Sequence, residues 1–252
     1  MKTLTLSIAL LLLPAVQGTV LAQDKVGPVR VALFDDNGSF GKGVPSVSEQ
    51  LGKDGAFVVT KLKGPQIGDG TLKHESFDVV IFTGGSGHKQ ADAIGPAGLA
   101  QVKAFVEQGG GYVGICAGAY LACDGFSWGV KILDAKTVSP KWRRGEGQVK
   151  IQATDKGREI LGFPSDQLDI RYANGPIYKA AGSPGIPDFE PLAFFRTELA
   201  EHDSPKGAMV NAPAMVAGTF GKGRVICSSP HPEQTAGMEG FIVRAVKWTA
   251  GR

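Results

Sequence analysis

A glycine-flanked cysteine, Cys116, is the residue of this sequence whose surroundings best suit covalent chemistry. It lies in Gly114-Ile115-Cys116-Ala117-Gly118, between an apolar, strand-like run and a helical run. This G-x-C-x-G pattern is typical of a nucleophile elbow, a strand-to-helix turn in which glycines relieve crowding around a strained residue. The positive end of the helix dipole would favour a thiolate there. The alternative is a small buried apolar residue on a tight turn.

Backbone N–H groups near this turn could stabilise negative charge on a substrate oxygen. The N–H of Ala117 points toward the position where the oxyanion of an acyl transfer would develop. Gly85 is expected to supply the second donor, because Gly84-Gly85 follows a strand predicted to neighbour the elbow. Gly84 itself is a weaker candidate for a substrate contact.

A histidine and a carboxylate follow a later strand, in Ser228-Ser229-Pro230-His231-Pro232-Glu233. In an extended segment, residues at i and i+2 point the same way, so Glu233 could orient the His231 ring while the ring accepts the Cys116 proton. Two prolines stiffen the segment. The alternative for His231 is an exposed turn residue at a strand end, and the elbow makes the role of base the favoured interpretation.

Apolar strand-like runs alternate with amphipathic helical runs along the chain, which predicts an α/β domain with a mostly parallel sheet. Strands are expected at residues 29–34, 57–59, 77–82 and 112–115, and helices at residues 44–51, 99–108 and 241–248. Residues 130–133 and 148–153 are expected as antiparallel additions, and residues 208–216 and 218–226 as a hairpin that turns at 221–223. Ligands of such sheets bind at the carboxyl ends of the strands.

The N-terminus has the features of a secretory signal peptide. Met1-Lys2 precedes an apolar run that is short for a transmembrane span, and Val20-Leu21-Ala22 fits a cleavage site. We therefore expect a signal peptide at residues 1–22, a single domain at residues 23–252, and an exported protein, periplasmic or extracellular, with no membrane span after cleavage. An uncleaved anchor helix is the alternative.

The charge and the ligand-forming residues argue against several classes of function. The formal net charge is +3, or about +2 without Lys2, and the short basic cluster Lys141-Trp142-Arg143-Arg144 is more typical of a solvated loop than of a nucleic-acid site. The three cysteines and four histidines lack the spacing of a metal site, so no metal or other cofactor is expected.

The two remaining cysteines, Cys123 and Cys227, are predicted at similar depths beneath the site. Cys123 lies about 10 Å along the helix from Cys116, and Cys227 lies about 13 Å along the strand before His231. They could form a disulfide that leaves Cys116 free, or they could both be core residues.

Three motifs together resemble the class I glutamine amidotransferase-like superfamily. They are Thr83-Gly84-Gly85, Gly110-Gly111-Tyr112-Val113-Gly114-Ile115-Cys116-Ala117-Gly118-Ala119-Tyr120, and His231-Pro232-Glu233. The second motif looks most like the N-terminal, amidotransferase-like domain of biotin-protein ligases. The resemblance covers residues 29–123 and 218–252 well and the middle loosely. It implies a flavodoxin-like sheet with helices on both faces and a triad of Cys116, His231 and Glu233.

The resemblance does not by itself imply that this chain uses glutamine, the substrate of that superfamily. Members of the superfamily that use glutamine usually carry the pattern G-x-C-x-G-x-Q at the elbow. In this chain the last position of the pattern is Tyr120, a second weak candidate for a substrate contact. A phenol cannot supply both an amide donor and an amide acceptor. Gly221-Lys222-Gly223-Arg224 is interpreted as a hairpin turn rather than a ligase loop, and the loop from Gly38 to Gly43 as a weak anion or substrate site.

Three functions are compatible with these residues. The first is a cysteine hydrolase that acts on an amide or acyl bond of a small molecule through a thioester. The second is a non-catalytic module that uses the same pocket to bind a small ligand or an envelope partner. The third is a redox or stress role, against which the His231 and Glu233 pair argues.

Overall fold

Apolar strands buried on both faces form the centre of the molecule. The computed structural model describes residues 27–53 and 55–252, so the expected signal peptide lies outside the described residues. Strands β1 (Val29–Phe34), β3 (Val79–Phe82) and β4 (Gly111–Ile115) are almost entirely buried. Such near-continuous apolar runs are typical of parallel strands covered by helices on both sides.

These strands belong to a nine-stranded mixed sheet with the order β2-β1-β3-β4-β11-β10-β9-β6-β7. The first five strands are parallel, and their order is that of a flavodoxin-like sheet. The predicted fold class is therefore confirmed. The remaining pairs are antiparallel, as expected for residues 148–153. The other six strands are β2 (Phe57–Leu62), β6 (Glu146–Ala153), β7 (Gln167–Ala173), β9 (Glu190–Phe195), β10 (Pro213–Phe220) and β11 (Gly223–Ser228).

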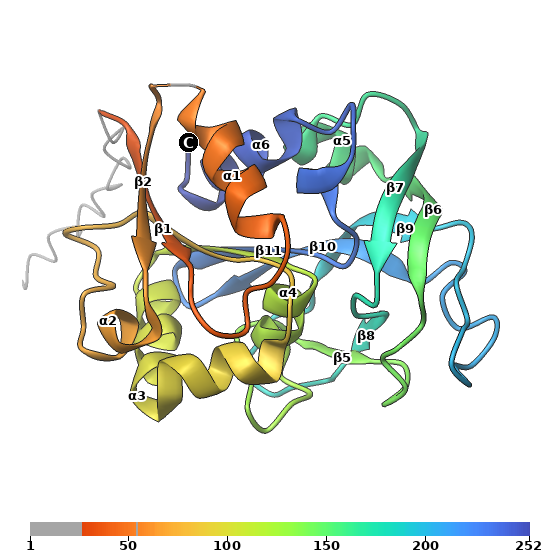
Figure 1. Ribbon diagram of the computed structural model, residues 1–252, viewed down its shortest axis with the longest axis horizontal. Coiled ribbons are helices and arrows are strands. Elements are labelled where there is room, and N and C mark those ends of the chain that lie inside the picture. Colours follow the sequence, from red (N-terminus) through yellow and green to blue (C-terminus); the bar gives the residue numbers. More distant parts are fainter. Residues whose placement is uncertain (1–26, 54) are drawn as a thin grey trace, which may run out of the picture.

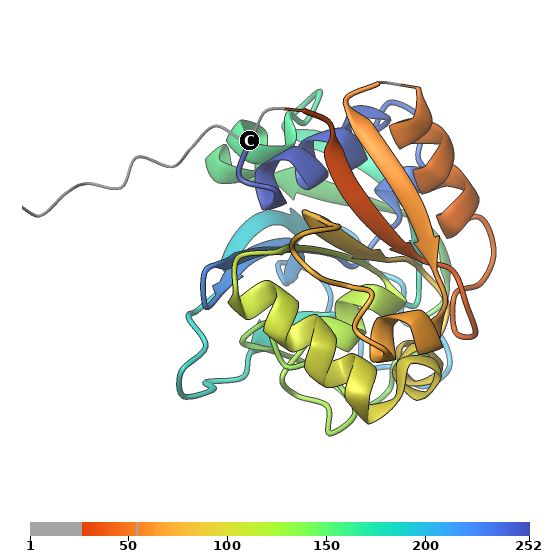
Figure 2. The ribbon, with the colours of Figure 1, turned by 90° about the vertical axis from the view of Figure 1, so that its left-hand side faces the viewer.

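Helices cover both faces of the sheet (Figures 1 and 2). One face carries α1 (Gly43–Gly52), α5 (Asp155–Leu161) and α6 (Gly240–Thr249), and the other carries α2 (Gly64–Gly68), α3 (Gly87–Glu107) and α4 (Ala117–Ala122). Alternate side chains of β1 enter two separate apolar cores. The sheet is thereby held between two layers, and its strand ends are fixed relative to one another.

Two predicted elements begin several residues away from where they were expected. The helix expected at residues 99–108 begins at Gly87, and a kink at Gly95 and Pro96 interrupts the apolar pattern that would have shown it. The first strand of the predicted hairpin begins at Pro213 rather than at residue 208. Its pairing with β11 across Gly221-Lys222 is as predicted.

The strand predicted at residues 130–133 is wrong. This run is buried, but its backbone bonds to the end of α4: Val130 N donates to Leu121 O at 2.7 Å, and Ile132 N to Ala122 O at 3.0 Å. A small separate sheet follows, in which β5 (Ala135–Thr137) pairs with β8 (Tyr178–Ala180). Burial of an apolar run does not by itself require sheet pairing.

All three cysteines are free thiols, so the disulfide considered for Cys123 and Cys227 is wrong. Both side chains are buried in the same apolar core. The Cys123 thiol donates to Ala119 O at 3.2 Å, as an i to i−4 contact of its helix. Burial raises the pKa of both thiols, which keeps them protonated and unreactive.

In residues 27–53 and 55–252, no helix is long and apolar enough to cross a membrane.

Candidate active site

The loops that leave the carboxyl ends of β1, β3, β4 and β11 meet at one edge of the sheet. The register of β11 on β4 places Ser228 beside Ile115, so the loops after these two strands begin side by side. A cavity of about 430 Å³ opens at this edge. Its lining includes Cys116 from the loop after β4 and His231 from the loop after β11. This is the place at which open α/β sheets bind their ligands.

Cys116 adopts the strained turn that the glycine pattern predicts. Its backbone has φ 51° and ψ −97°, in a region that residues with a Cβ rarely occupy. The Cys116 N–H donates to Ser228 O at 2.8 Å and ties the elbow to β11. A Cβ on Gly118 would overlap the Phe82 carbonyl, so the first turn of α4 can press against β3 only with glycine at that position.

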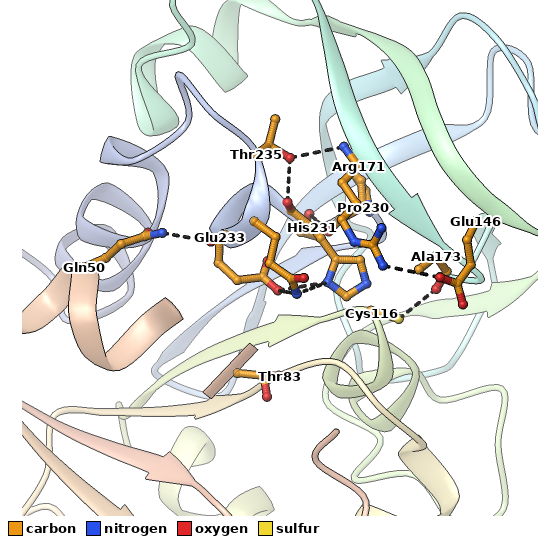
Figure 3. A network of polar contacts seen from close by, with 12 residues as sticks. Gln50, Thr83, Cys116, Glu146, Arg171, Ala173, Pro230, His231, Glu233 and Thr235 are labelled. Atoms are coloured by element: carbon orange, nitrogen blue, oxygen red, sulfur yellow. Dashed lines mark hydrogen bonds and ion pairs between the residues drawn. The ribbon is translucent and has the colours of Figure 1, made fainter. Parts of the chain in front are cut away.

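His231 and Glu233 form a buried pair. The Nδ1 atom of His231 lies 2.9 Å from Glu233 Oε1, and the two side chains are 6% and 0% exposed (Figure 3). Residues Pro232–Gln234 form a single 3₁₀ turn, so the expected extended segment is wrong although the pair itself forms. A turn brings residues two apart together here because Pro232 fixes its first position.

Hydrogen bonds to two other elements, β7 and α1, and to the neighbouring Thr235 anchor the backbone of this pair. His231 N donates to Arg171 O at 2.7 Å on β7, and Thr235 Oγ1 donates to His231 O at 2.7 Å. Gln50 of α1 donates to Glu233 O at 2.9 Å. The pair is therefore held from both sides of the sheet edge, as Figure 3 shows.

The other ring nitrogen, Nε2 of His231, faces Cys116 (Figure 3). The Cys116 thiol donates instead to Ala173 O at 3.3 Å, and no aligned hydrogen bond to Nε2 forms with any described residue. Catalytic pairs often align only when substrate is present.

Opposing effects act on the pKa of His231. Burial lowers this pKa, but the interactions with Cys116 and with the Glu233 carboxylate outweigh burial and raise it to about 10. The imidazolium form is therefore favoured while the sulfur carries negative charge.

The two predicted oxyanion donors, Gly85 and Ala117, differ in exposure. Gly85 is exposed and lines the cavity, whereas Ala117 is buried directly behind Cys116. Within the described part of the chain, neither N–H has a backbone acceptor. Gly85 therefore lines the cavity with an N–H that has no backbone acceptor among the described residues, whereas Ala117 is not part of the lining.

The loop from Gly38 to Gly43 lies against Gly84 and Gly85. Phe40 N donates to Gly84 O at 3.1 Å, and Ser86 N donates to Gly38 O at 2.8 Å. Phe40, Gly41 and Lys42 line the cavity, so the structure places this weak sequence candidate at the site.

Most of the remaining cavity wall was missed from the sequence. It comes from the irregular segments around α4 and from β6 and β7, where no motif pointed to a site. The missed lining residues are Ser86, Gly87, His88, Phe126, Trp128, Thr137, Ser139, Pro140, Trp142, Glu146, Arg171, Ala173, Asn174 and Gln234. The sequence signal that could have pointed to this wall is the pair Trp128 and Trp142, which lie close together in a stretch rich in loops.

The predicted solvated basic loop is wrong for Arg144. Its side chain is only 2% exposed, donates to Pro205 O at 2.9 Å and lies 3.8 Å from Glu198. Lys141 and Arg143 are exposed as expected. Among the described residues, no group of three or more His, Cys, Asp or Glu side chains is arranged to hold a metal ion.

The fold of this chain is similar to that of glutamine amidotransferase-like proteins. A glutamine amidotransferase structure superposes with a TM-score of 0.58 at 19% identity, covering 88% of this chain and 99% of the other. PurLQS from Thermotoga maritima gives 0.58 at 15% identity, with 88% and 97% covered. A putative ThuA-like protein from Bacteroides uniformis gives 0.58 at 16% identity, with 90% and 94% covered. Likeness at these identities concerns the fold.

Residues 57–141 match the family described as biotin-protein ligase, N terminal. The resemblance predicted from the three motifs is thereby confirmed. An uncharacterized protein of Chlamydia muridarum is 31% identical over 112 residues, which cover 44% of this chain and 34% of that protein. The chain thus spans about a third of the length of this relative.

The contact between Gly84 and the His231 ring gives a first prediction. A Cβ on Gly84 would lie 2.7 Å from His231 Cε1, so Gly84→Ala must displace the buried ring. We expect the alkylation rate of Cys116 by iodoacetamide to fall about 10²-fold, because small displacements of catalytic groups have effects of that size. Gly52→Ala, where a Cβ meets nothing within 4 Å, is the control and should leave the rate unchanged. An unchanged rate in Gly84→Ala would show that the ring position does not matter.

The pKa of His231 gives a second prediction. We expect its ring nitrogens to titrate near pH 10 in an NMR titration, with the charged form present below that value. Glu233→Gln removes a negative charge that stabilises imidazolium, so the transition should move to lower pH. His74, His88 and His202 serve as internal references in the same spectra. A transition that stays in place in Glu233→Gln would contradict the pairing.

Proposed function

We propose that this protein is a cysteine-dependent hydrolase of an amide or related acyl bond in a small molecule. The observation that carries the proposal is the buried His231 ring, bonded to Glu233 through Nδ1 at 2.9 Å and facing Cys116 with Nε2. A nucleophile, a base and an orienting carboxylate in this arrangement are the components of a catalytic triad.

In the proposed first step, the Cys116 proton has already passed to His231 Nε2, and the Sγ thiolate forms a bond to the substrate carbonyl carbon. The oxygen becomes an oxyanion held by the N–H groups of Gly85 and Ala117. The carbon–nitrogen or carbon–oxygen bond then breaks, and His231 gives its proton to the leaving group. A thioester remains on Cys116.

In the second step, water attacks the thioester carbon while His231 Nε2 takes a proton from it. The sulfur–carbon bond breaks, the carboxylic acid leaves, and the proton returns to Cys116. Glu233 keeps the ring oriented and stabilises imidazolium in both steps, in agreement with the raised pKa of His231.

Glutamine is not the proposed substrate. Tyr120 stands at the position where the superfamily motif has glutamine, and its hydroxyl donates to Asn174 O at 3.1 Å. Its donor is therefore already used within the protein, and the side chain offers the cavity mainly a ring face.

We test the proposal with a chloroacetamide electrophile and a panel of amide and ester substrates. We expect one adduct per molecule, at Cys116, with adduct and hydrolysis both lost in Cys116→Ala. His231→Asn should slow both by about 10²-fold or more. The control Cys123→Ala, which removes a buried thiol away from the cavity, should behave as the parent protein. Full hydrolysis by Cys116→Ala overturns the proposal, and ordinary thiol reactivity that is unaffected by His231→Asn favours a non-catalytic binding module.

Export is the second part of the proposal. Its support is the sequence pattern of residues 1–22, which ends at Ala22. When the full chain is expressed in a bacterial host, mass spectrometry should find a mature protein that begins at Gln23 in the periplasm or the medium. A protein that keeps residues 1–22 and stays in the cytoplasm would contradict it.

A further inference from the structure

Aromatic side chains form one continuous wall of the cavity beside Cys116. The Tyr120 ring meets the Phe126 ring edge to face at 5.7 Å between centroids, and Phe126 stacks on Trp128 at 4.7 Å and 24°. His88 meets the far edge of Trp128 at 5.7 Å. The wall begins one helical turn from Cys116, because Tyr120 lies four residues further along α4.

Two further aromatic side chains on the cavity lining are left uncovered. Phe40 is 50% exposed and Trp142 is 54% exposed, and both line this cavity from loops outside α4. Large apolar side chains exposed to water are unfavourable, and their gathering around one cavity is typical of a binding site. Only Val58 and Val210 are comparably exposed large apolar residues in the described part of the chain, and neither lines the cavity.

The charged side chains of the cavity lining include Lys42, Glu146 and Arg171, so Glu146 is the one carboxylate among the described residues that line it. Arg171 and Glu146 lie 3.3 Å apart and neutralise each other at the cavity. Gln234 is engaged, since its amide donates to Glu233 Oε1 at 2.8 Å. A substrate ammonium would have to compete with Arg171 for Glu146, whereas an uncharged ring would not.

We infer that the substrate carries a planar, apolar ring next to its scissile carbonyl, and that the ring stacks on the wall formed by Tyr120, Phe126 and Trp128. The substrate class is thus an aryl or heteroaryl amide or ester. This inference rests on the proposed function for the bond that is cleaved, but the preference of the wall for a flat ring is independent of Cys116. Phe40 and Trp142, which line the same cavity, offer further apolar contact to the substrate ring. Flat rings gain stacking energy on such a surface that saturated rings of the same size do not.

The test measures equilibrium binding to the full-length Cys116→Ala protein, in which no turnover occurs. The probes are benzamide, cyclohexanecarboxamide and L-glutamine, and calorimetry measures the binding of each. We expect benzamide to bind about three- to tenfold more tightly than cyclohexanecarboxamide, the range that aromatic stacking provides. Phe126→Leu, which keeps an apolar side chain, should abolish that preference. Val210→Ala, which removes an exposed apolar group outside the cavity, should keep it.

Tryptophan fluorescence locates the binding. Of the three tryptophans, Trp128 and Trp142 line the cavity, and Trp248 lies on α6. Benzamide should therefore protect part of the emission from iodide quenching, and the protection should be lost in Trp128→Phe with Trp142→Phe.

The inference is overturned if glutamine binds more tightly than benzamide, if the preference for the flat ring survives Phe126→Leu, or if benzamide does not bind at millimolar concentration. Loss of the proposed hydrolase activity has a different signature. In that case the flat ring is still preferred by the Cys116→Ala protein, while the parent protein forms no adduct at Cys116.

Discussion

The backbone of Cys116 is the constraint on which the rest of the site depends. A residue with φ 51° and ψ −97° costs of the order of 1–3 kcal/mol, and packing must hold it in place. The Cys116 N–H bond to Ser228 and the close contact of Gly118 with Phe82 provide that support. As a result, the sulfur projects from the sheet edge beside the loop after β11, where His231 lies.

The second part of the site, His231 and Glu233, depends on where the backbone of Cys116 places the sulfur. His231 is buried, which disfavours its charged form, and Glu233 offsets that effect at 2.9 Å from Nδ1. Gln50 of α1 and Arg171 of β7 fix the backbone of the pair through hydrogen bonds. The imidazole can therefore carry a proton without moving, which proton transfer in acyl chemistry requires.

The cavity outside these groups has a different character. Its wall next to Cys116 is aromatic, and Tyr120 takes part in that wall through its ring while its hydroxyl bonds to Asn174. An amidotransferase-like fold thus combines here with a surface that favours flat apolar groups. Fold and substrate are separate properties, because the loops at the strand ends can change while the sheet stays the same.

The sequence by itself determined the parallel sheet, the elbow and the pairing of His231 with Glu233, because each rests on local pattern: buried apolar runs, glycines around Cys116, and a short spacing after a strand. It did not predict that residues 130–133 lie outside any sheet, since their backbone partners are on α4. Nor did it reveal that Phe126, Trp128 and Trp142 line the cavity. Those residues reach the site only through packing of irregular segments, a long-range effect that leaves no periodic signal in the chain. The tertiary structure therefore decided the shape and chemistry of the cavity.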